Sequence, residues 1–192
     1  MNSAPVIEAD PRHAVGVLSV TTVLKEAGLV DDTFFTELSR WRGSVVHKIC
    51  EYEDLNDLDE SSVDDAVRGY LEAYRTFKQD YRFEPALIEH DVYSTTFRYK
   101  GRLDRFGALN GKKAILDIKT GTVHKTCALQ LAGYAFALAG RLDVPSCRMA
   151  LRIDSHGTYQ LKEYRLEDYR DDIQAFLGAV NIANWKRRND VR

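Results

Sequence analysis

The stretch Ile115–Lys119, ILDIK, carries the pattern that decides how this part of the chain folds. Apolar and polar residues alternate in it, and residues two apart in a β-strand point to the same face. Asp117 and Lys119 therefore share one face, while Leu116 and Ile118 point the other way, toward the core. The pair Asn110–Gly111 shortly before it is favoured in two-residue hairpin turns. We expect this stretch to be the second strand of a hairpin.

The same alternation recurs before and after this stretch, in segments bounded by turn residues. One helical segment, His124–Leu138, follows the hairpin and precedes another strand. A strand–helix–strand connection of this length is right-handed and pairs its strands in parallel. The fold class is therefore α/β, with a mixed β-sheet flanked by helices. The expected strands are Ala86–Tyr93, Thr95–Phe106, Lys113–Ile118, Arg148–Ile153 and Tyr159–Tyr164.

Apolar residues at helical spacing predict further helices on both sides of the strand-rich region. Ser19 is expected to be the N-cap of a short helix that stops at Gly28, with Val23 and Leu24 turned inward. The other expected helices run from Asp31–Asp32 to about Tyr52 with a break near Gly43, from a cap at Ser61 or Ser62, and from Leu166 to Trp185; the acidic segment Glu51–Glu60 is expected to be a solvated loop.

The composition is that of a globular protein. The chain has 192 residues, of which 44% are hydrophobic and 29% charged, and it has no long linker, so we expect one domain, residues 1–192. Residues 1–18 form a small hairpin or a flexible arm in this interpretation. The nearly apolar run Cys127–Gly140 is interrupted by Gln130 and is too short to cross a bilayer. We expect no membrane partner and a cytoplasmic protein.

Charge and cysteine content narrow the classes of partner and cofactor. The formal net charge of −2 excludes a surface coated in basic residues, so any nucleic-acid site must be local. The three cysteines, Cys50, Cys127 and Cys147, lie far apart and form no C-x-x-C pair. We expect them to be reduced and buried.

Asp104 and Asp117 are candidate metal-binding carboxylates. A hairpin brings Asp104 beside Asp117, thirteen residues later, and neighbouring carboxylates repel each other unless a cation lies between them. Hard oxygen ligands suit Mg²⁺ or Mn²⁺. Such a metal activates water and neutralises phosphate charge, while the ammonium of Lys119 meets the attacking water or a developing oxyanion. The triplet D-x-K alone is common, however, and an Asp and a Lys on one strand are usually a solvated face.

Four motifs stand in order along the chain: RGSVVH at Arg42–His47, GRLD at Gly101–Asp104, ILDIKTG at Ile115–Gly121, and QLAGY at Gln130–Tyr134. In order and spacing they resemble the motifs of the RecB-like branch of the PD-(D/E)xK nucleases. The opening SVTTVL of Ser19–Leu24 also resembles small nucleases carried by phages and the mitochondrial genome-maintenance exonuclease. The resemblance covers most of the chain, from Ser19 to Ala139.

This resemblance implies a restriction-endonuclease-like core and a role for each matching residue. Lys119 is the catalytic lysine, Gln130 and Tyr134 border the site, and Glu89 matches, by a single letter, an acidic residue on the family's first strand. The implied metal ligands, for Mg²⁺ or Mn²⁺, are His47, Asp104, Asp117 and the backbone carbonyl of Ile118.

The resemblance also implies an activity and its partners. The expected activity is a metal-dependent deoxyribonuclease, an exonuclease acting at DNA ends in replication, repair or recombination, with DNA as substrate and proteins of these processes as partners. Relatives with an iron-sulfur cluster use four grouped cysteines, so no cluster is expected here. An endonuclease of the same superfamily and a nuclease-fold module that binds without cutting remain alternatives.

The residues themselves leave plainer interpretations open. His47 is equally a helix histidine paired with Glu51 one turn later, and Gln130 and Tyr134 are equally ordinary interface residues. Basic residues on the helix of His47 (Arg40, Arg42 and Lys48) are candidates for a phosphate path, which Lys186, Arg187 and Arg188 would extend, although charge runs near a terminus are usually only solvated.

Overall fold

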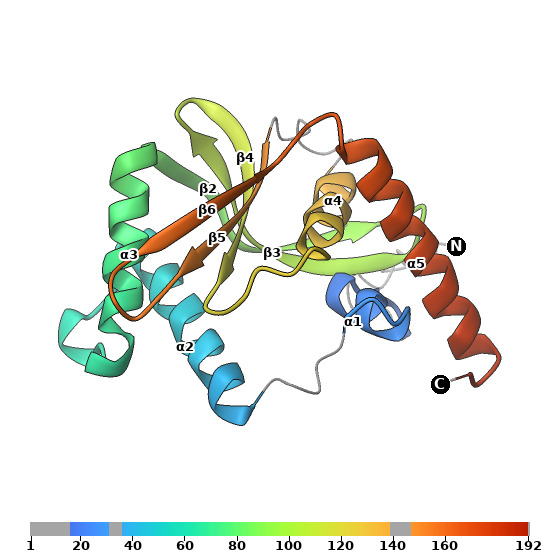
Figure 1. Ribbon diagram of the computed structural model, residues 1–192, viewed down its shortest axis with the longest axis horizontal. Coiled ribbons are helices and arrows are strands. Elements are labelled where there is room, and N and C mark those ends of the chain that lie inside the picture. Colours follow the sequence, from blue (N-terminus) through green and yellow to red (C-terminus); the bar gives the residue numbers. More distant parts are fainter. Residues whose placement is uncertain (1–15, 31–35, 139–146, 192) are drawn as a thin grey trace, which may run out of the picture.

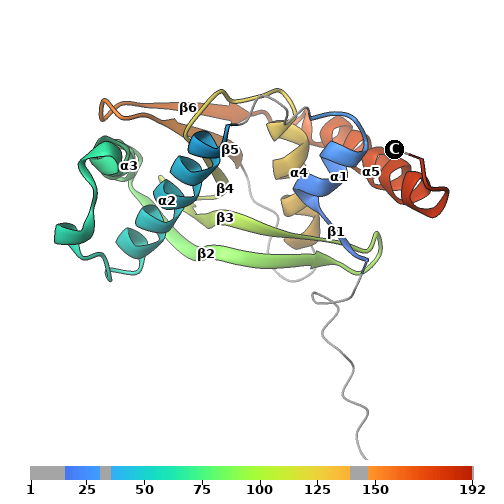
Figure 2. The same ribbon diagram turned by 90° about the horizontal axis from the view of Figure 1, so that it is seen from below.

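The computed structural model describes residues 16–30, 36–138 and 147–191. A six-stranded mixed sheet runs through the molecule, with helices α2 and α3 gathered at one end and α1, α4 and α5 at the other (Figures 1 and 2). The predicted α/β class, a mixed sheet flanked by helices, is confirmed. Within the described residues, no helix is both long and apolar enough to cross a membrane.

The sheet combines antiparallel hairpins with one parallel crossover. Strand order is β1-β3-β4-β5-β6, and β2 pairs with β3 outside this path. Asn110 and Gly111 both have positive φ, 48° and 78°, as the predicted two-residue hairpin requires. β4 and β5 pair in parallel across a helical crossover, also as predicted. The strands are β1 (Leu18–Ser19), β2 (Phe83–Ser94), β3 (Tyr99–Leu109), β4 (Lys112–Lys119), β5 (Cys147–Ile153) and β6 (Tyr159–Tyr164).

Two apolar cores form, because successive strand residues face opposite sides of the sheet. On β4, Ile115 packs into the core beneath α1, α4 and α5, whereas Leu116 and Ile118 pack into the core beneath α2 and α3. All three cysteines are free and buried, as expected. The helices are α1 (Val20–Glu26), α2 (Glu37–Asp54), a 3₁₀ turn η2 (Glu60–Ser62), α3 (Asp65–Tyr81), α4 (Cys127–Leu138) and α5 (Tyr169–Arg188).

Several predicted boundaries are wrong, each for a local reason. The N-cap of α3 is Asp64, which accepts from the Ala66 N–H, because Ser61 is held by the Asp59 side chain in the preceding 3₁₀ turn. α2 runs unbroken through Gly43 and continues to Asp54, inside the predicted acidic loop. The buried residues Val46 and Cys50 hold it against the sheet, and such packing outweighs the helix cost of a glycine, about 1 kcal/mol.

Other expectations concern segment ends. The N-cap role of Ser19 is confirmed, since its side chain accepts from the Thr22 N–H, and Val23 and Leu24 are buried. β3 begins at Tyr99 rather than Thr95, because residues 95–98 form the turn from β2. Most of the predicted arm 1–18 and the predicted start of the second helix at residues 31–35 lie outside the described residues.

A buried ion network joins the end of α2 to α3 and the sheet. The fully buried Arg105 donates from Nε to Asp54 Oδ2 at 2.6 Å and from Nη1 to Glu89 Oε1 at 2.9 Å. Asp54, whose side chain has no exposed surface, also accepts from the Tyr74 hydroxyl and the Lys78 ammonium, each at 2.6 Å. Removal of Arg105 would leave buried carboxylates short of a cation.

We therefore expect Arg105→Met to lower the free energy of unfolding by about 3–5 kcal/mol, the usual cost of breaking a buried ion pair from one side. Urea denaturation without metal measures this. Arg105→Lys should recover part of the loss because it keeps the charge without the planar fork. Arg102→Met, on the same strand but in an exposed pair with Asp91, should cost no more than about 1 kcal/mol. Equal midpoints for Arg105→Met and the parent would contradict this role.

Candidate active site

The site lies at a gap in the pairing of β3. On the side opposite β2, β1 pairs with β3 at Tyr99 and Lys100, and β4 pairs with β3 from Arg105 onward. The four residues between these partners are Gly101–Asp104, the predicted GRLD motif. The motif therefore marks the place where β3 and β4 separate. In this gap side chains, rather than a neighbouring strand, lie next to β3.

Asp104 fills this gap from the β3 side. Its Oδ2 accepts the backbone N–H of Ile118 at 2.6 Å, so a carboxylate replaces the carbonyl that a paired strand would supply. Gly101 admits a ring from α4: a Cβ at this position would lie 2.5 Å from Cε1 of Tyr134, closer than real contacts allow. Gly101 and Asp104, the first and last residues of the motif, are thus required for different reasons: the first makes room for a ring, and the second accepts a backbone hydrogen bond.

His47 reaches the same gap from α2. Its Nδ1 lies 3.6 Å from Glu89 Oε1 and 3.7 Å from Asp104 Oδ1. Its Nε2 lies 3.0 Å from the carbonyl oxygen of Ile118. The alternative pairing with Glu51 is wrong, because both ring nitrogens of His47 face these other groups. His47, Glu89 and Asp104 each offer one ligand atom, and these atoms lie within 4.8 Å of one another.

The carboxylates around His47 favour a positive charge at this place. Burial lowers the pKa of His47, but Asp104, Glu89 and Asp117 outweigh it and raise that pKa to about 9. Burial raises the pKa of Asp104 to about 6, and the nearby carboxylate of Asp117 adds to the shift. Glu89 has a pKa below its usual value, since His47 and Arg105 together outweigh its burial. With this pKa the imidazole of His47 carries a proton at neutral pH and adds a positive charge to those of Arg105 and Lys119.

The donor set fits a divalent cation. A histidine nitrogen and two carboxylate oxygens suit Mn²⁺ and, through the oxygens, Mg²⁺. Metal-binding histidines usually donate their other ring N–H to a carbonyl or carboxylate, and here Nε2 faces the Ile118 carbonyl while Nδ1 faces the carboxylates. This gives Ile118 an orienting position. That its carbonyl also binds metal stays a prediction.

The other predicted residues form a second cluster around Asp117. Its Oδ1 accepts from Gln130 Nε2 at 2.8 Å, and its Oδ2 lies 2.8 Å from the Lys119 ammonium. Gln130 Nε2 also lies 3.2 Å from the Tyr134 hydroxyl, and its Oε1 lies 3.3 Å from Lys119 Nζ. Both carboxylate oxygens of Asp117 therefore already have a partner: the Gln130 amide at Oδ1 and the Lys119 ammonium at Oδ2.

The structure thus divides the predicted site residues into two neighbouring groups. His47, Glu89 and Asp104 converge as candidate ligands, whereas Asp117 pairs with Lys119 and is not a member of that group. Asp117 still acts on the pKa of both His47 and Asp104, so the groups lie close together. That Asp117 binds metal stays a prediction.

Two contributors were missed by the sequence interpretation. They are Arg105, which donates a hydrogen bond to the Glu89 carboxylate, and Asp54, which accepts one from Arg105. The available signal was an arginine between Asp104 and the apolar end of the strand, Phe106–Leu109, where a buried charge needs partners. Glu89 also has φ 45° within β2, an uncommon conformation for this residue type that redirects its side chain.

The proposed phosphate path remains a prediction. Lys48 is engaged with Glu51, and Arg42 has a buried Nε without a hydrogen-bond partner among the described residues. Phe97 packs edge-on against Phe136, with ring centroids 5.5 Å apart, and Tyr99 is fully buried. Tyr99 belongs to the core beneath α1, α4 and α5, and Phe97 packs against that core.

The near-isosteric change Asp104→Asn tests the metal centre. It should weaken Mn²⁺ binding by more than the roughly 10- to 100-fold that loss of an outer partner commonly costs, because it removes a charged ligand but preserves shape. Titration calorimetry measures this, with the exposed Asp57→Asn as matched control. His47→Ala should weaken Mn²⁺ more than Mg²⁺, since nitrogen is the softer donor. Unchanged Mn²⁺ affinity in Asp104→Asn would remove Asp104 from the site, and Asp117→Asn in the same series tests Asp117 as a ligand.

No family model matches this chain, and no curated protein matches it. Among solved structures it is similar to a "Putative exonuclease" from Eubacterium rectale, with a TM-score of 0.49, 8% identity, and coverage of 88% of this chain and 75% of that chain. It is also similar to SSO0001, with a TM-score of 0.35, 15% identity, and coverage of 85% and 83%. At these values neither likeness assigns a function to the chain.

Proposed function

We propose that this chain is a Mg²⁺- or Mn²⁺-dependent deoxyribonuclease that hydrolyses phosphodiester bonds, working as an exonuclease at DNA ends. The observation that carries the proposal is the convergence of His47, Glu89 and Asp104, close to the ion pair of Lys119 with Asp117. A cation site next to a fixed ammonium suits a reaction in which negative charge builds up on a phosphate. The motifs that resemble RecB-like nucleases support the choice of DNA, of ends, and of a setting in replication, repair or recombination.

The residues proposed to hold the ion are His47, Glu89 and Asp104, with Asp117 and the Ile118 carbonyl as further candidates. When bound, a divalent ion would neutralise phosphate charge and favour ionisation of water. The buried Arg105 keeps Glu89 ionised and aimed at the cluster. The Ile118 carbonyl, in contact with His47 Nε2, keeps Nδ1 turned toward the carboxylates.

Lys119 contributes charge rather than basicity. Burial lowers its pKa, but Asp117 outweighs this effect and raises the pKa above its ordinary value. An ammonium that stays protonated has donors only, so Lys119 cannot accept the proton of the attacking water. It can donate to that water or to a phosphate oxygen as negative charge develops. Gln130 contacts both members of the Asp117–Lys119 pair and thereby fixes the direction of the ammonium.

We expect Lys119→Ala to slow single-turnover DNA cleavage by roughly a hundredfold to a thousandfold, about 3–4 kcal/mol of transition-state stabilisation. Mn²⁺ binding should persist, because an ammonium cannot ligate a cation. The slope of log affinity for duplex DNA against log salt should change by only about 0.9. The exposed Lys125→Ala is the matched control and should cut like the parent. Near-parental cutting by Lys119→Ala would exclude this mechanism.

A time course on DNA with and without ends separates the kinds of nuclease. End-labelled linear DNA should be degraded from its ends with Mg²⁺ or Mn²⁺ and stay intact with EDTA, whereas closed circular DNA should persist. Cutting of the circle would instead show an endonuclease. Absence of cutting with either metal, in a chain that still binds DNA, would favour a binding module.

A further inference from the structure

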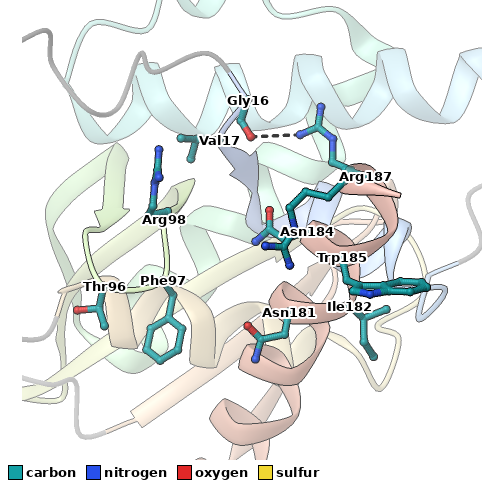
Figure 3. Close-up of a pocket in the computed structure, with 11 residues that line it drawn as sticks. Gly16, Val17, Thr96, Phe97, Arg98, Asn181, Ile182, Asn184, Trp185 and Arg187 are labelled. Atoms are coloured by element: carbon teal, nitrogen blue, oxygen red, sulfur yellow. Dashed lines mark hydrogen bonds between the residues drawn. The ribbon is translucent and has the colours of Figure 1, made fainter. Parts of the chain in front are cut away.

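A groove of about 860 Å³ lies between the turn that joins β2 to β3 and the C-terminal half of α5, away from the candidate metal ligands His47, Glu89 and Asp104. Figure 3 shows the turn on one wall and the helix on the other. In Figure 1 this is the end of the molecule farthest from α3. Its lining residues are Gly16, Val17, Thr96, Phe97, Arg98, Asn181, Ile182, Asn184, Trp185, Arg187 and Arg188.

The groove is locally basic in a chain of net charge −2. Arg98, Arg187 and Arg188 line it, all three exposed, and the described lining includes no Asp or Glu. Figure 3 shows Arg98 and Arg187 on the two sides of the Gly16–Val17 segment. The groove is thus a local group of positive charges, as a local nucleic-acid surface requires.

The structure separates the basic run near the C-terminus into two roles. Lys186 donates to the carbonyl oxygen of Glu26 at 2.9 Å and so ties α5 to the end of α1. Arg187 donates to the Gly16 carbonyl at 3.2 Å and lies 3.8 Å from the Glu26 carboxylate, which holds its guanidinium at the groove. Arg188 has no ion pair within the described part of the chain. The run is therefore more than a solvated tail.

An exposed aromatic residue adjoins these charges. Trp185 is 53% exposed and Ile182 is 52% exposed, and Figure 3 shows them side by side on α5, on the flank of the helix away from the β2–β3 turn. Two asparagine amides, Asn181 and Asn184, line the same stretch of helix. Basic side chains next to an exposed aromatic face match the way proteins hold unpaired nucleic acid, with phosphates on cations and bases on rings.

We propose that this groove binds a single-stranded segment of the DNA substrate, with phosphates at Arg98 and Arg188 and a base against Trp185. The inference rests on the proposed function for the identity of the strand. Arg98 precedes Asp104 by six residues, and at about 3.3 Å per strand residue it lies roughly 20 Å from this candidate metal ligand. A strand several nucleotides long can reach both places, and a very short one cannot.

Binding in EDTA tests the groove apart from cutting. The probe is a fluorescein-labelled 20-nucleotide oligo-dT, followed by anisotropy across a salt series. Arg98→Ala combined with Arg188→Ala should weaken binding about tenfold or more at low salt and reduce the salt slope by about 1.4, since each single-strand phosphate contact contributes about 0.7. Trp185→Ala should weaken it about fivefold or more. Arg170→Ala, exposed at the other end of α5, is the matched control and should bind like the parent.

Tryptophan emission reports direct contact, because the chain has only two tryptophans, Trp41 and Trp185. In Trp41→Phe, oligo-dT should quench the emission that Trp185 alone provides, and Trp185→Phe should lose most of the quenching. Parental affinity in both groove variants would overturn the proposal, as would absence of oligo-dT binding by the parent. Tighter binding of a 20-base-pair duplex, with the same sensitivity to the groove variants, would overturn the single-strand assignment.

The two proposals fail separately. If the chain cuts DNA, groove variants should raise KM for long oligonucleotides with little change in kcat, and cutting of a four-nucleotide substrate should equal that of the parent. Lys119→Ala should show the reverse, with slow cutting and nearly parental binding of oligo-dT. A parent that binds oligo-dT through the groove but cuts nothing would refute the nuclease and leave the strand-binding site standing. A nuclease whose groove variants bind normally would do the opposite.

Discussion

The rest of the site depends on the ion pairs of the buried Arg105 guanidinium. A charged group without solvent contact is stable only if partners satisfy it, and its partners come from α2 (Asp54) and β2 (Glu89). Asp54 lies two helical turns beyond His47, on the same face of α2. The ion pair that fixes the end of the helix therefore also fixes where His47 meets the sheet.

The gap in β3 sets the second constraint. Where β4 separates from β3, backbone N–H groups lose their strand partner and must find another acceptor. The carboxylate of Asp104 is the acceptor for the Ile118 N–H. This hydrogen bond holds the carboxylate at the edge of the gap. A single interaction thus satisfies the Ile118 N–H and positions a candidate ligand beside His47.

Charge in the site is balanced in two parts. Asp117 is matched by Lys119, and Glu89 and Asp104 are matched by the protonated imidazole of His47 with support from Arg105. The first balance is a fixed ion pair. The second depends on the proton of His47, at the position that a divalent cation would take under the proposed function.

The sequence by itself determined the elements whose signals are local. Alternation around Asp117 and Lys119 predicted a strand, Asn110–Gly111 predicted its hairpin, and Ser19 predicted a helix cap, because turn geometry, caps and strand periodicity depend on residues a few positions apart. It also indicated Asp104, Lys119 and Gln130, since their motifs keep a fixed spacing along the chain.

Only the tertiary structure decided how those residues are divided. The convergence of His47 with Glu89 and Asp104, the pairing of Asp117 with Lys119, and the support from Arg105 and Asp54 all depend on which atoms face each other across different elements. The basic groove between the β2–β3 turn and α5 has the same origin. Such contacts join residues far apart in sequence, and burial and charge balance are settled only when the elements pack together.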